Sequence, residues 1–311
     1  MVTGLFPSMT YSAFLPVLLQ AWFIGANAFI CCRPQGAHLP RPLFLNRIFV
    51  EADEVKGDRT ISLAKDDPRS KHISKILRLG AGDTIKLGVV DEGKTDSGRV
   101  VSVEEEDGSL LLSLGDGELI TDRVEPRVDL LLACPRPLRL ERLLPVVACM
   151  GVTRLVLLDA EKVEKDFFGS HLFRRPAEVR AGFIEGLSQA SADFVLPTLL
   201  VRRRLLRFIT EELDALYPSD VYKRVIAHPC AAPGAQSSSL TQLSRDGPAQ
   251  RKMVVAVGPE GGWTDAEVQL FLGHGFAPVS LGDRILRTDM AVPALLSLAR
   301  EWTFSTNASG L

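Results

Sequence analysis

The chain has 311 residues, enough for about two domains, and 46% of them are hydrophobic while 24% are charged. This composition excludes a disordered chain, a collagen and a coiled coil. The formal net charge of −2 excludes a protein that is basic throughout, so any nucleic-acid site must be a local patch. The five cysteines contain no C-x-x-C pair, which argues against a zinc ribbon or a disulfide scaffold, and we expect no metal site.

Residues 1–43 are predicted to form a targeting leader, because no Asp or Glu precedes Glu51. Residues 13–32 are apolar and long enough to span a bilayer, and Ala26-Asn27-Ala28 matches the A-x-A cleavage signature. The basic residues that follow resemble the second part of leaders that direct proteins to plastids bounded by extra membranes. A mitochondrial presequence, a cytoplasmic protein and a retained membrane anchor are the alternatives. We expect the mature protein not to be embedded in a membrane.

Residues 44–120 are predicted to form a small β-barrel domain. Residues 84–89, 99–103 and 109–114 are strand-like runs separated by turns that contain glycine. Residues 67–79 are predicted to be a helix with one apolar stripe. That stripe consists of Ile73, Ile76, Leu77 and Leu79. Many short strands with one helix favour a small barrel.

The predicted helix carries a group of basic side chains and no acid over residues 69–78. Its four lysines and arginines are Arg69, Lys71, Lys75 and Arg78. On the exposed side of one helix they are candidates for RNA phosphate contacts. A helix face that is merely solvated is the alternative.

Residues 88–95 match the P-loop pattern G-x-x-x-x-G-K-[ST]. A P-loop needs backbone amides curled around phosphate at the start of a helix. Here Asp91 and Glu92 would place two negative charges inside that cradle, and a strand-like run follows instead of an amphipathic helix. We therefore predict a hairpin turn.

After a linker at residues 121–127, strand and helix patterns alternate through residues 128–304, and residues 305–311 form a tail. The predicted strands are 128–133, 154–158, 225–228, 253–257 and 278–281. The predicted helices are 138–150, 176–191, 264–272 and 291–302. This alternation predicts an α/β domain with a parallel sheet and helices on both faces. A ligand is then expected beyond the carboxyl ends of the strands.

Glycines cluster after two late strands of this domain, at residues 258–262 and 282–288. Glycine permits positive φ and a close approach of backbone to ligand, so free amides and carbonyls could read a flat purine edge. Tight turns without a ligand are the alternative. No G-x-G-x-x-G occurs, so the dinucleotide fingerprint is absent.

The segment VGPEGGWTDAE, followed about twenty residues later by LGDRILRTD, strongly resembles the signature of the 16S ribosomal RNA (uracil-N3)-methyltransferase family of the SPOUT class. The resemblance covers roughly residues 44–304. It includes HISKILRLGAGDTIKLGVVDEGK in the small domain and CPRPLRLERLL after the first strand of the second domain. It implies a trefoil-knotted α/β domain preceded by a PUA-like RNA-binding barrel.

The resemblance also implies an enzyme that methylates N3 of one uridine in small-subunit ribosomal RNA, free or in the assembled small subunit. Its cofactor would be S-adenosylmethionine, and it would act as a homodimer. The cofactor-binding residues carried over are His228, Gly258, Glu260, Gly261, Leu281, Gly282, Ile285, Leu286 and Arg287.

The uracil N3 proton must leave during methyl transfer, and a nearby cation would stabilise the developing anion. Arg136 and Arg287 are the candidates for this role, and Arg284 is a candidate for RNA binding. Phosphate contacts and salt bridges within a dimer are the alternatives for these arginines. Glu260 is a candidate general base, although it could equally orient backbone amides or bind the ligand.

One departure from the family pattern leaves a second function open. Many family members have Glu and Thr where this chain has Asp289 and Met290. The shorter carboxylate and the lost hydroxyl put the rate in doubt. The alternative function is therefore a ribosome-assembly protein of the same fold that binds RNA but is catalytically impaired.

Overall fold

The computed structural model describes residues 47–104, 109–122, 125, 128–228, 238–243 and 250–304, all of which lie in one compact unit, Phe44–Leu311. The predicted leader and tail lie outside the described residues, as do parts of the predicted linker. None of the described helices is both long enough and apolar enough to cross a membrane.

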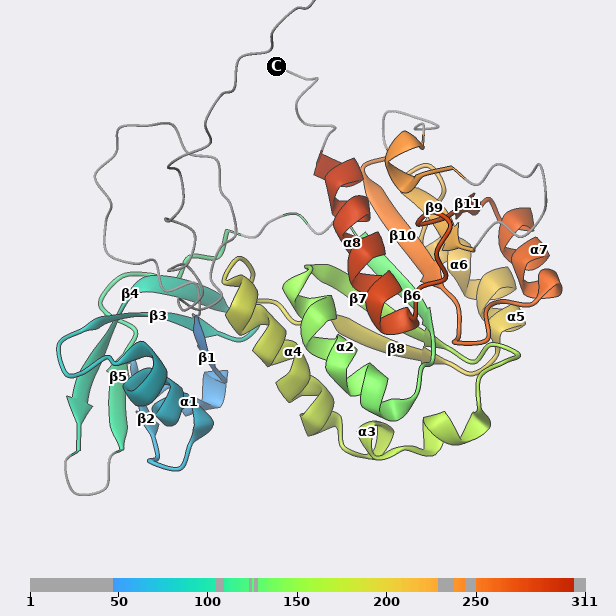
Figure 1. Cartoon of the computed structure of the whole chain (residues 1–311). Helices are drawn as coiled ribbons and strands as arrows, with labels where there is room; N and C mark the ends of the chain where they lie inside the picture. Colours follow the sequence, from blue (N-terminus) through green and yellow to red (C-terminus); the bar gives the residue numbers. More distant parts are fainter. Residues whose placement is uncertain are drawn as a thin grey trace, which may run out of the picture. The chain divides into compact units, whose positions relative to one another are not determined.

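The small domain is built on a five-stranded sheet of described residues (Figure 1). Its order is β1 (Ile48–Val50), β3 (Thr84–Val89), β4 (Gly93–Val103), β5 (Leu110–Ser113) and β2 (Thr60–Leu63). β1 pairs parallel with β3, and the other pairs are antiparallel. The three predicted strands are confirmed. Closure of the sheet into a PUA-like barrel stays a prediction.

The helix predicted at residues 67–79 is shorter and partly π-helical. It consists of α1 (Pro68–Lys71) and η2 (His72–Leu77), ends at Arg78 with φ 54°, and follows the short η1 (Ala52–Glu54). Ile73 and Leu77 are buried, but Ile76 is 69% exposed, so its place in the predicted stripe was wrong. The wide turn of a π-helix keeps residues four apart on one face and turns Ile76 to solvent.

The P-loop-like segment is a hairpin turn between β3 and β4, as predicted. Strand β4 begins at Gly93, where a P-loop would begin a helix. The turn is fixed to the loop after α4 (Pro176–Ala190). The amide of Asp91 donates to the Phe194 carbonyl at 2.8 Å, and Lys94 Nζ donates to the Ala192 carbonyl at 2.6 Å. The lysine of the false motif therefore has a structural partner.

The second domain is an α/β domain whose described strands form a six-stranded parallel sheet. Its order is β11 (Ala277–Val279), β9 (Tyr222–Ala227), β10 (Lys252–Val257), β6 (Val128–Ala133), β7 (Val152–Leu158) and β8 (Thr198–Arg202). Five of these strands were predicted. Strand β8 was missed; Thr198 is exposed and its other four residues are only half-buried.

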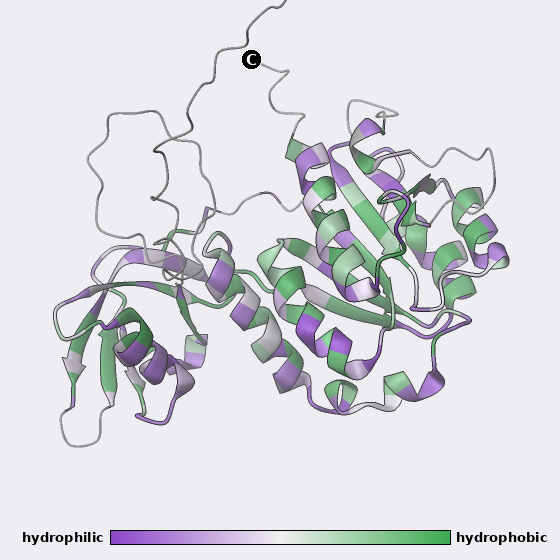
Figure 2. Cartoon of the chain, viewed as in Figure 1, coloured by the Kyte–Doolittle hydropathy of each residue, from purple (hydrophilic) through white to green (hydrophobic). Residues whose placement is uncertain are grey.

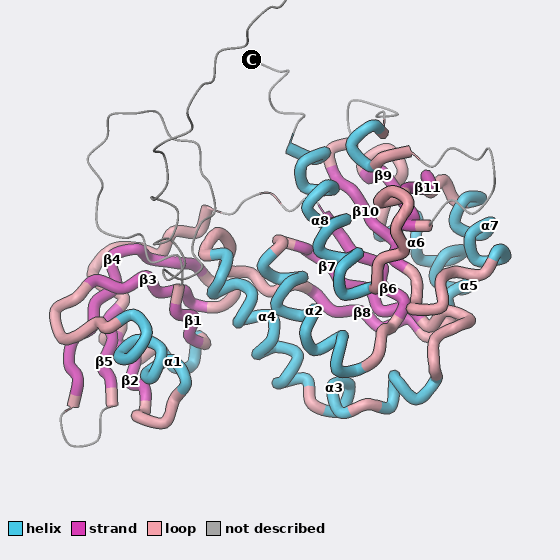
Figure 3. The backbone as a smooth tube through the Cα atoms, viewed as in Figure 1, coloured by secondary structure: helices cyan, strands magenta, loops and turns pink. Residues whose placement is uncertain are grey.

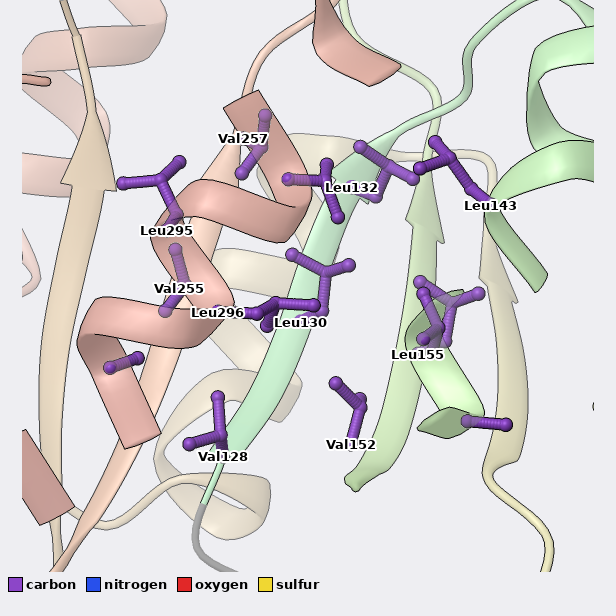
Figure 4. Packing of buried hydrophobic residues seen from close by; sticks show 14 of the residues in the cluster. Val128, Leu130, Leu132, Leu143, Val152, Leu155, Val255, Val257, Leu295 and Leu296 are labelled. Atoms are coloured by element: carbon purple, nitrogen blue, oxygen red, sulfur yellow. The ribbon is translucent and has the colours of Figure 1, made fainter. Parts of the chain in front are cut away.

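Helices cover both faces of this sheet (Figure 1), and Figure 4 shows the packing of buried residues on the first of these faces. The first face carries α2 (Pro137–Cys149), α4 and α8 (Thr288–Phe304). The second carries α5 (Leu205–Arg207), η4 (Phe208–Glu212), α6 (Leu213–Leu216) and α7 (Asp265–Gly273). The remaining short elements are η3 (Lys165–Gly169), α3 (His171–Arg174) and η5 (Leu240–Gln242).

Alternate residues of one strand pack on opposite faces. In β6, Leu130 and Leu132 face α8 and α2, whereas Leu131 belongs to the cluster on the other face. Figure 2 shows this domain's central strands as predominantly hydrophobic. The buried core also includes Leu240 of η5. Trp302 Nε1 donates to the Leu243 carbonyl at 3.0 Å, which joins the end of η5 to α8.

Replacing Gly186 with alanine is expected to lower the free energy of unfolding by about 2 kcal/mol. Gly186 lies where α4 crosses α2, and a Cβ there would be 2.1 Å from the Pro145 carbonyl oxygen. Alanine normally stabilises a helix interior, so the loss would be due to the clash. Urea unfolding measures it. Gly273→Ala is the control, because a Cβ at Gly273 meets nothing within 4 Å; equal midpoints for the two variants would contradict the expectation.

Asp129 is expected to lower the free energy of unfolding as the pH rises from 4 to 6. Burial raises the pKa of this β6 carboxyl to about 6, although the Arg154 amide donates to it at 2.8 Å. Because that pKa is above the unfolded value, the folded chain binds more protons between the two values. The free energy of unfolding of Asp129→Asn minus that of the wild type should therefore increase by about 1 kcal/mol from pH 5 to pH 7.5. Urea unfolding at the two pH values measures this difference. A constant difference would contradict this.

Candidate functional site

Two loops that contain glycine meet at the carboxyl edge of the parallel sheet. One follows β10 and the other follows β11, with the end of β9 between them in the sheet order. The amide of His228, directly after β9, donates to the Val279 carbonyl at 3.0 Å and joins this strand end to β11. In Figure 3 the loop that enters α8 runs past the carboxyl ends of the central strands. Parallel sheets bind ligands at this edge.

The first loop, residues 258–264, is shaped by close backbone packing. A Cβ at Gly258 would be 3.0 Å from Trp263 Nε1, so the buried indole lies directly against this backbone. Gly262 has φ +71° and its amide donates to the Pro259 carbonyl at 2.8 Å, which closes a turn. Thr264 and Glu267 form a capping box, and α7 begins directly after Thr264.

A neighbouring loop braces this turn from outside. Lys162 Nζ, after β7, donates to the Gly261 carbonyl at 3.0 Å. The Glu267 carboxylate accepts from the amides of Glu161 at 2.7 Å and Thr264 at 2.8 Å. One buried carboxylate thus joins the start of α7 to the loop after β7.

The second loop, residues 280–287, has a glycine in the left-handed region. Gly282 has φ +99°, a conformation that side chains with Cβ branches avoid. At the end of the loop Arg287 forms an ion pair with Asp289 at 2.9 Å. Ile285 is 89% exposed even though it borders a cavity.

The two loops enclose a cavity of about 580 Å³. The nine residues predicted to bind a cofactor all line it. They are His228, Gly258, Glu260, Gly261, Leu281, Gly282, Ile285, Leu286 and Arg287. The structure therefore places segments separated in the sequence around one space, while the roles of these residues stay predictions.

Two polar atoms at this cavity are buried without a hydrogen-bond partner among the described residues. They are His228 Nδ1 and Trp263 Nε1. Apolar side chains such as Val257, Val279 and Leu295 also line the cavity. A flat apolar ring with polar edges fits such a wall.

The cavity also has a charged mouth. Glu260 accepts a hydrogen bond from Arg139, and its other oxygen is 3.2 Å from Arg136 Nε. Arg139 lines the cavity, as do Arg284 and Arg287, whereas Arg136 reaches it through Glu260.

Sequence reasoning missed Arg139 and Trp263 as lining residues. Arg139 is three positions after Arg136, so the i, i+3 spacing on α2 could have indicated it.

The predicted RNA-binding residues of the small domain do not share one environment. Arg69 forms ion pairs with Glu54 at 2.5 Å and with Asp67 at 2.7 Å. The hydrogen bond to Glu54 raises the pKa of the Arg69 guanidinium above its usual value. Its charge is thus balanced inside the domain, which favours a structural role. Lys71, Lys75 and Arg78 are exposed.

No group of three or more metal-ligating side chains occurs within the described ranges.

A family model described as "RNA methyltransferase domain" matches residues 123–300. The Treponema pallidum protein "Ribosomal RNA small subunit methyltransferase E" is 28% identical over 262 residues, which cover 83% of this chain and 93% of that protein. The Synechocystis protein of the same name is 56% identical over 50 residues, 16% of each chain.

Two solved structures share the fold over most of the chain. The Neisseria gonorrhoeae "Ribosomal RNA small subunit methyltransferase E", bound to S-adenosyl methionine, has a TM-score of 0.61 at 20% identity and covers 82% of this chain and 97% of its own. A Legionella pneumophila "putative methyltransferase" with bound SAM has a TM-score of 0.59 at 24% identity. It covers 82% of this chain and 96% of its own. These likenesses show the fold alone.

Proposed function

The chain belongs to the family of RNA methyltransferase domains, and from this premise we propose that it methylates small-subunit ribosomal RNA with S-adenosylmethionine as the methyl donor. The observation that carries the proposal is the cavity that the two glycine loops enclose together. The names of the curated relatives, which cover most of this chain, supply the RNA class.

The cavity fits the proposed donor. Its volume of about 580 Å³ lies within the usual range for small-ligand sites. At Gly282 a Cβ would meet nothing within 4 Å, so the backbone there is open to the approach of an adenine edge. His228, whose buried Nδ1 has no hydrogen-bond partner among the described residues, also lines the cavity. The donor supplies an activated methyl group on a sulfonium, and the chain's contribution is to hold and orient the reactants and to exclude water.

The proposed target atom is N3 of one uridine. Arg136 and Arg287 are the proposed cations for the uracil anion, because both lie at the cavity or its mouth. The two oxygens of Glu260 each face an arginine. That arrangement favours an electrostatic role for Glu260 over proton abstraction.

The rest of the proposed machinery follows the family resemblance. We propose that the cavity loops belong to a trefoil knot and that two copies form a homodimer. The small domain, through the exposed Lys71, Lys75 and Arg78, would contact RNA as a PUA-like module. The acid-free leader sequence supports an organelle, and a plastid first, as the site of action.

Methyl transfer to unmodified small-subunit ribosomal RNA tests the proposal. The purified chain, labelled S-adenosylmethionine and RNA, either free or assembled into small subunits, should yield 3-methyluridine at one position on mass spectrometry of nuclease digests. Absence of incorporation into both substrates would overturn it.

The second candidate function is an assembly protein that binds RNA without turnover. Asp289 and Met290 favour it. The Asp289 carboxylate forms an ion pair with the Arg287 guanidinium at 2.9 Å, and Met290 is 57% exposed. In the same assay this candidate gives RNA binding with no methyl incorporation, so any 3-methyluridine eliminates it.

A further inference from the structure

Arg136, Arg139 and Glu260, here called the Glu260 cluster, form a compact ion-pair group at the cavity mouth. The two carboxylate oxygens are each taken by a different arginine, with Arg136 Nε at 3.2 Å and Arg139 Nη1 in hydrogen-bond contact. The side chains are not buried: Arg136 is 59% exposed, Arg139 25% and Glu260 29%. Ion pairs that solvent reaches contribute little to stability, about 0–1 kcal/mol, so a competing charge can replace one partner.

Glu260 has a special place in the charge of the cavity. Among the described residues that line it, Glu260 is the sole carboxylate, whereas Arg139, Arg284 and Arg287 are cations. A ligand that carries a positive charge therefore finds one counter-ion on this wall. That counter-ion is already engaged with Arg136 and Arg139.

The arginines of the cluster suit a different partner. Guanidinium groups bind phosphate strongly, and Arg136 is the N-cap of α2, a 13-residue helix. A phosphate in place of the Glu260 carboxylate would meet both guanidinium groups. While Glu260 holds the two arginines, that site is masked by a carboxylate.

We propose that Glu260 is an exchangeable counter-ion that couples the two substrates. Without the methyl donor it masks Arg136 and Arg139. With the donor's sulfonium in the cavity, Glu260 turns to that charge and releases the two guanidinium groups for the bound RNA. Donor and RNA then bind with positive and reciprocal coupling. This inference rests on the proposed function.

Two nucleosides that differ in one charge test the coupling. Sinefungin carries an ammonium group where the donor has its sulfonium and cannot transfer a methyl group; S-adenosylhomocysteine lacks that charge. The probe RNA is an unmodified bacterial small-subunit ribosomal RNA transcript, bound to the full chain in a filter assay. Its dissociation constant should be at least about 5-fold lower with saturating sinefungin than with saturating S-adenosylhomocysteine.

Glu260→Gln gives the second arm of the test. Without any nucleoside this variant should bind the transcript several-fold more tightly than the wild type, because its arginines are already free. The difference between sinefungin and S-adenosylhomocysteine should vanish. The slope of log affinity against log salt should steepen by about 0.7 for each arginine released.

Glu164→Gln is the matched control. Glu164 is exposed on the loop after β7, whose Lys162 contacts Gly261, and it has no arginine partner among the described residues. This variant removes the same charge near the cavity and should keep the wild-type coupling.

The outcomes separate the two proposals. Equal RNA affinity with both nucleosides, or Glu260→Gln binding RNA no more tightly than Glu164→Gln, overturns the exchange but leaves the proposed function standing. Calorimetry with the same nucleosides reports on the site itself. If neither nucleoside binds, the proposed function fails and the exchange fails with it.

Discussion

Gly282→Val is expected to weaken S-adenosylmethionine binding by about 10- to 100-fold while the chain stays folded. Gly282 has φ +99°, and a residue with a branched Cβ is strained there whatever the space around it. The loop escapes the strain by rearranging, and the rearrangement moves Leu281, Ile285 and Leu286 away from the cavity they line. Isothermal titration calorimetry measures the change.

Two variants make this result specific. Gly282→Asn should lose less affinity, because asparagine tolerates positive φ better than valine does. Gly169→Val is the matched control, since Gly169 has no positive φ and a Cβ there meets nothing within 4 Å. Wild-type affinity in Gly282→Val, or an equal loss in Gly169→Val, would contradict the assignment of this loop to the cofactor.

Arg136→Ala is expected to lower kcat/KM for RNA methylation by about 100-fold, the size of effect seen when one donor to a developing oxyanion is removed. Arg136 is outside the cavity lining but is joined to it through Glu260. Binding of S-adenosylmethionine should therefore change by less than about 3-fold, and the loss should be seen with RNA present. Initial rates at varied RNA, together with calorimetry, separate the two effects.

Arg136→Lys should recover part of the activity, because lysine keeps the charge but not the planar fork of donors. Arg142→Ala, which removes an exposed arginine from the same helix, should stay close to the wild type. Activity of Arg136→Ala within about 3-fold of the wild type would assign the anion to another cation, with Arg287 as the next candidate.

Continuous apolar runs made the central sheet predictable. β6 and β10 are buried on both faces, and apart from Asp129, Lys252 and Met253 their residues are aliphatic. β8 escaped prediction because its apolar run, Leu199 to Val201, is only three residues long and none of its residues is fully buried. Ile76 was misplaced because a π-helical turn changes which residues share a face, and that turn has no local sequence signal.

The cavity was predicted from its glycines, and its charges were not fully predicted. Gly258 and Gly282 mark positions where the backbone must bend or approach closely, which is visible in a sequence. The contact of Arg139 with Glu260 joins residues 121 positions apart, and no local pattern specifies it. Asp129 is similar: its pKa of about 6 results from burial among three strands, not from its sequence neighbours.

The carboxylate of Glu267 has a consequence for how the protein responds to heat. It caps the first turn of α7 and also holds the amide of Glu161 from another loop. Fraying of that helical turn therefore loosens the wall of the cavity in the same event. Amide exchange at Glu161, Thr264 and Glu267 should accordingly rise and fall together, and a nucleoside in the cavity should slow all three.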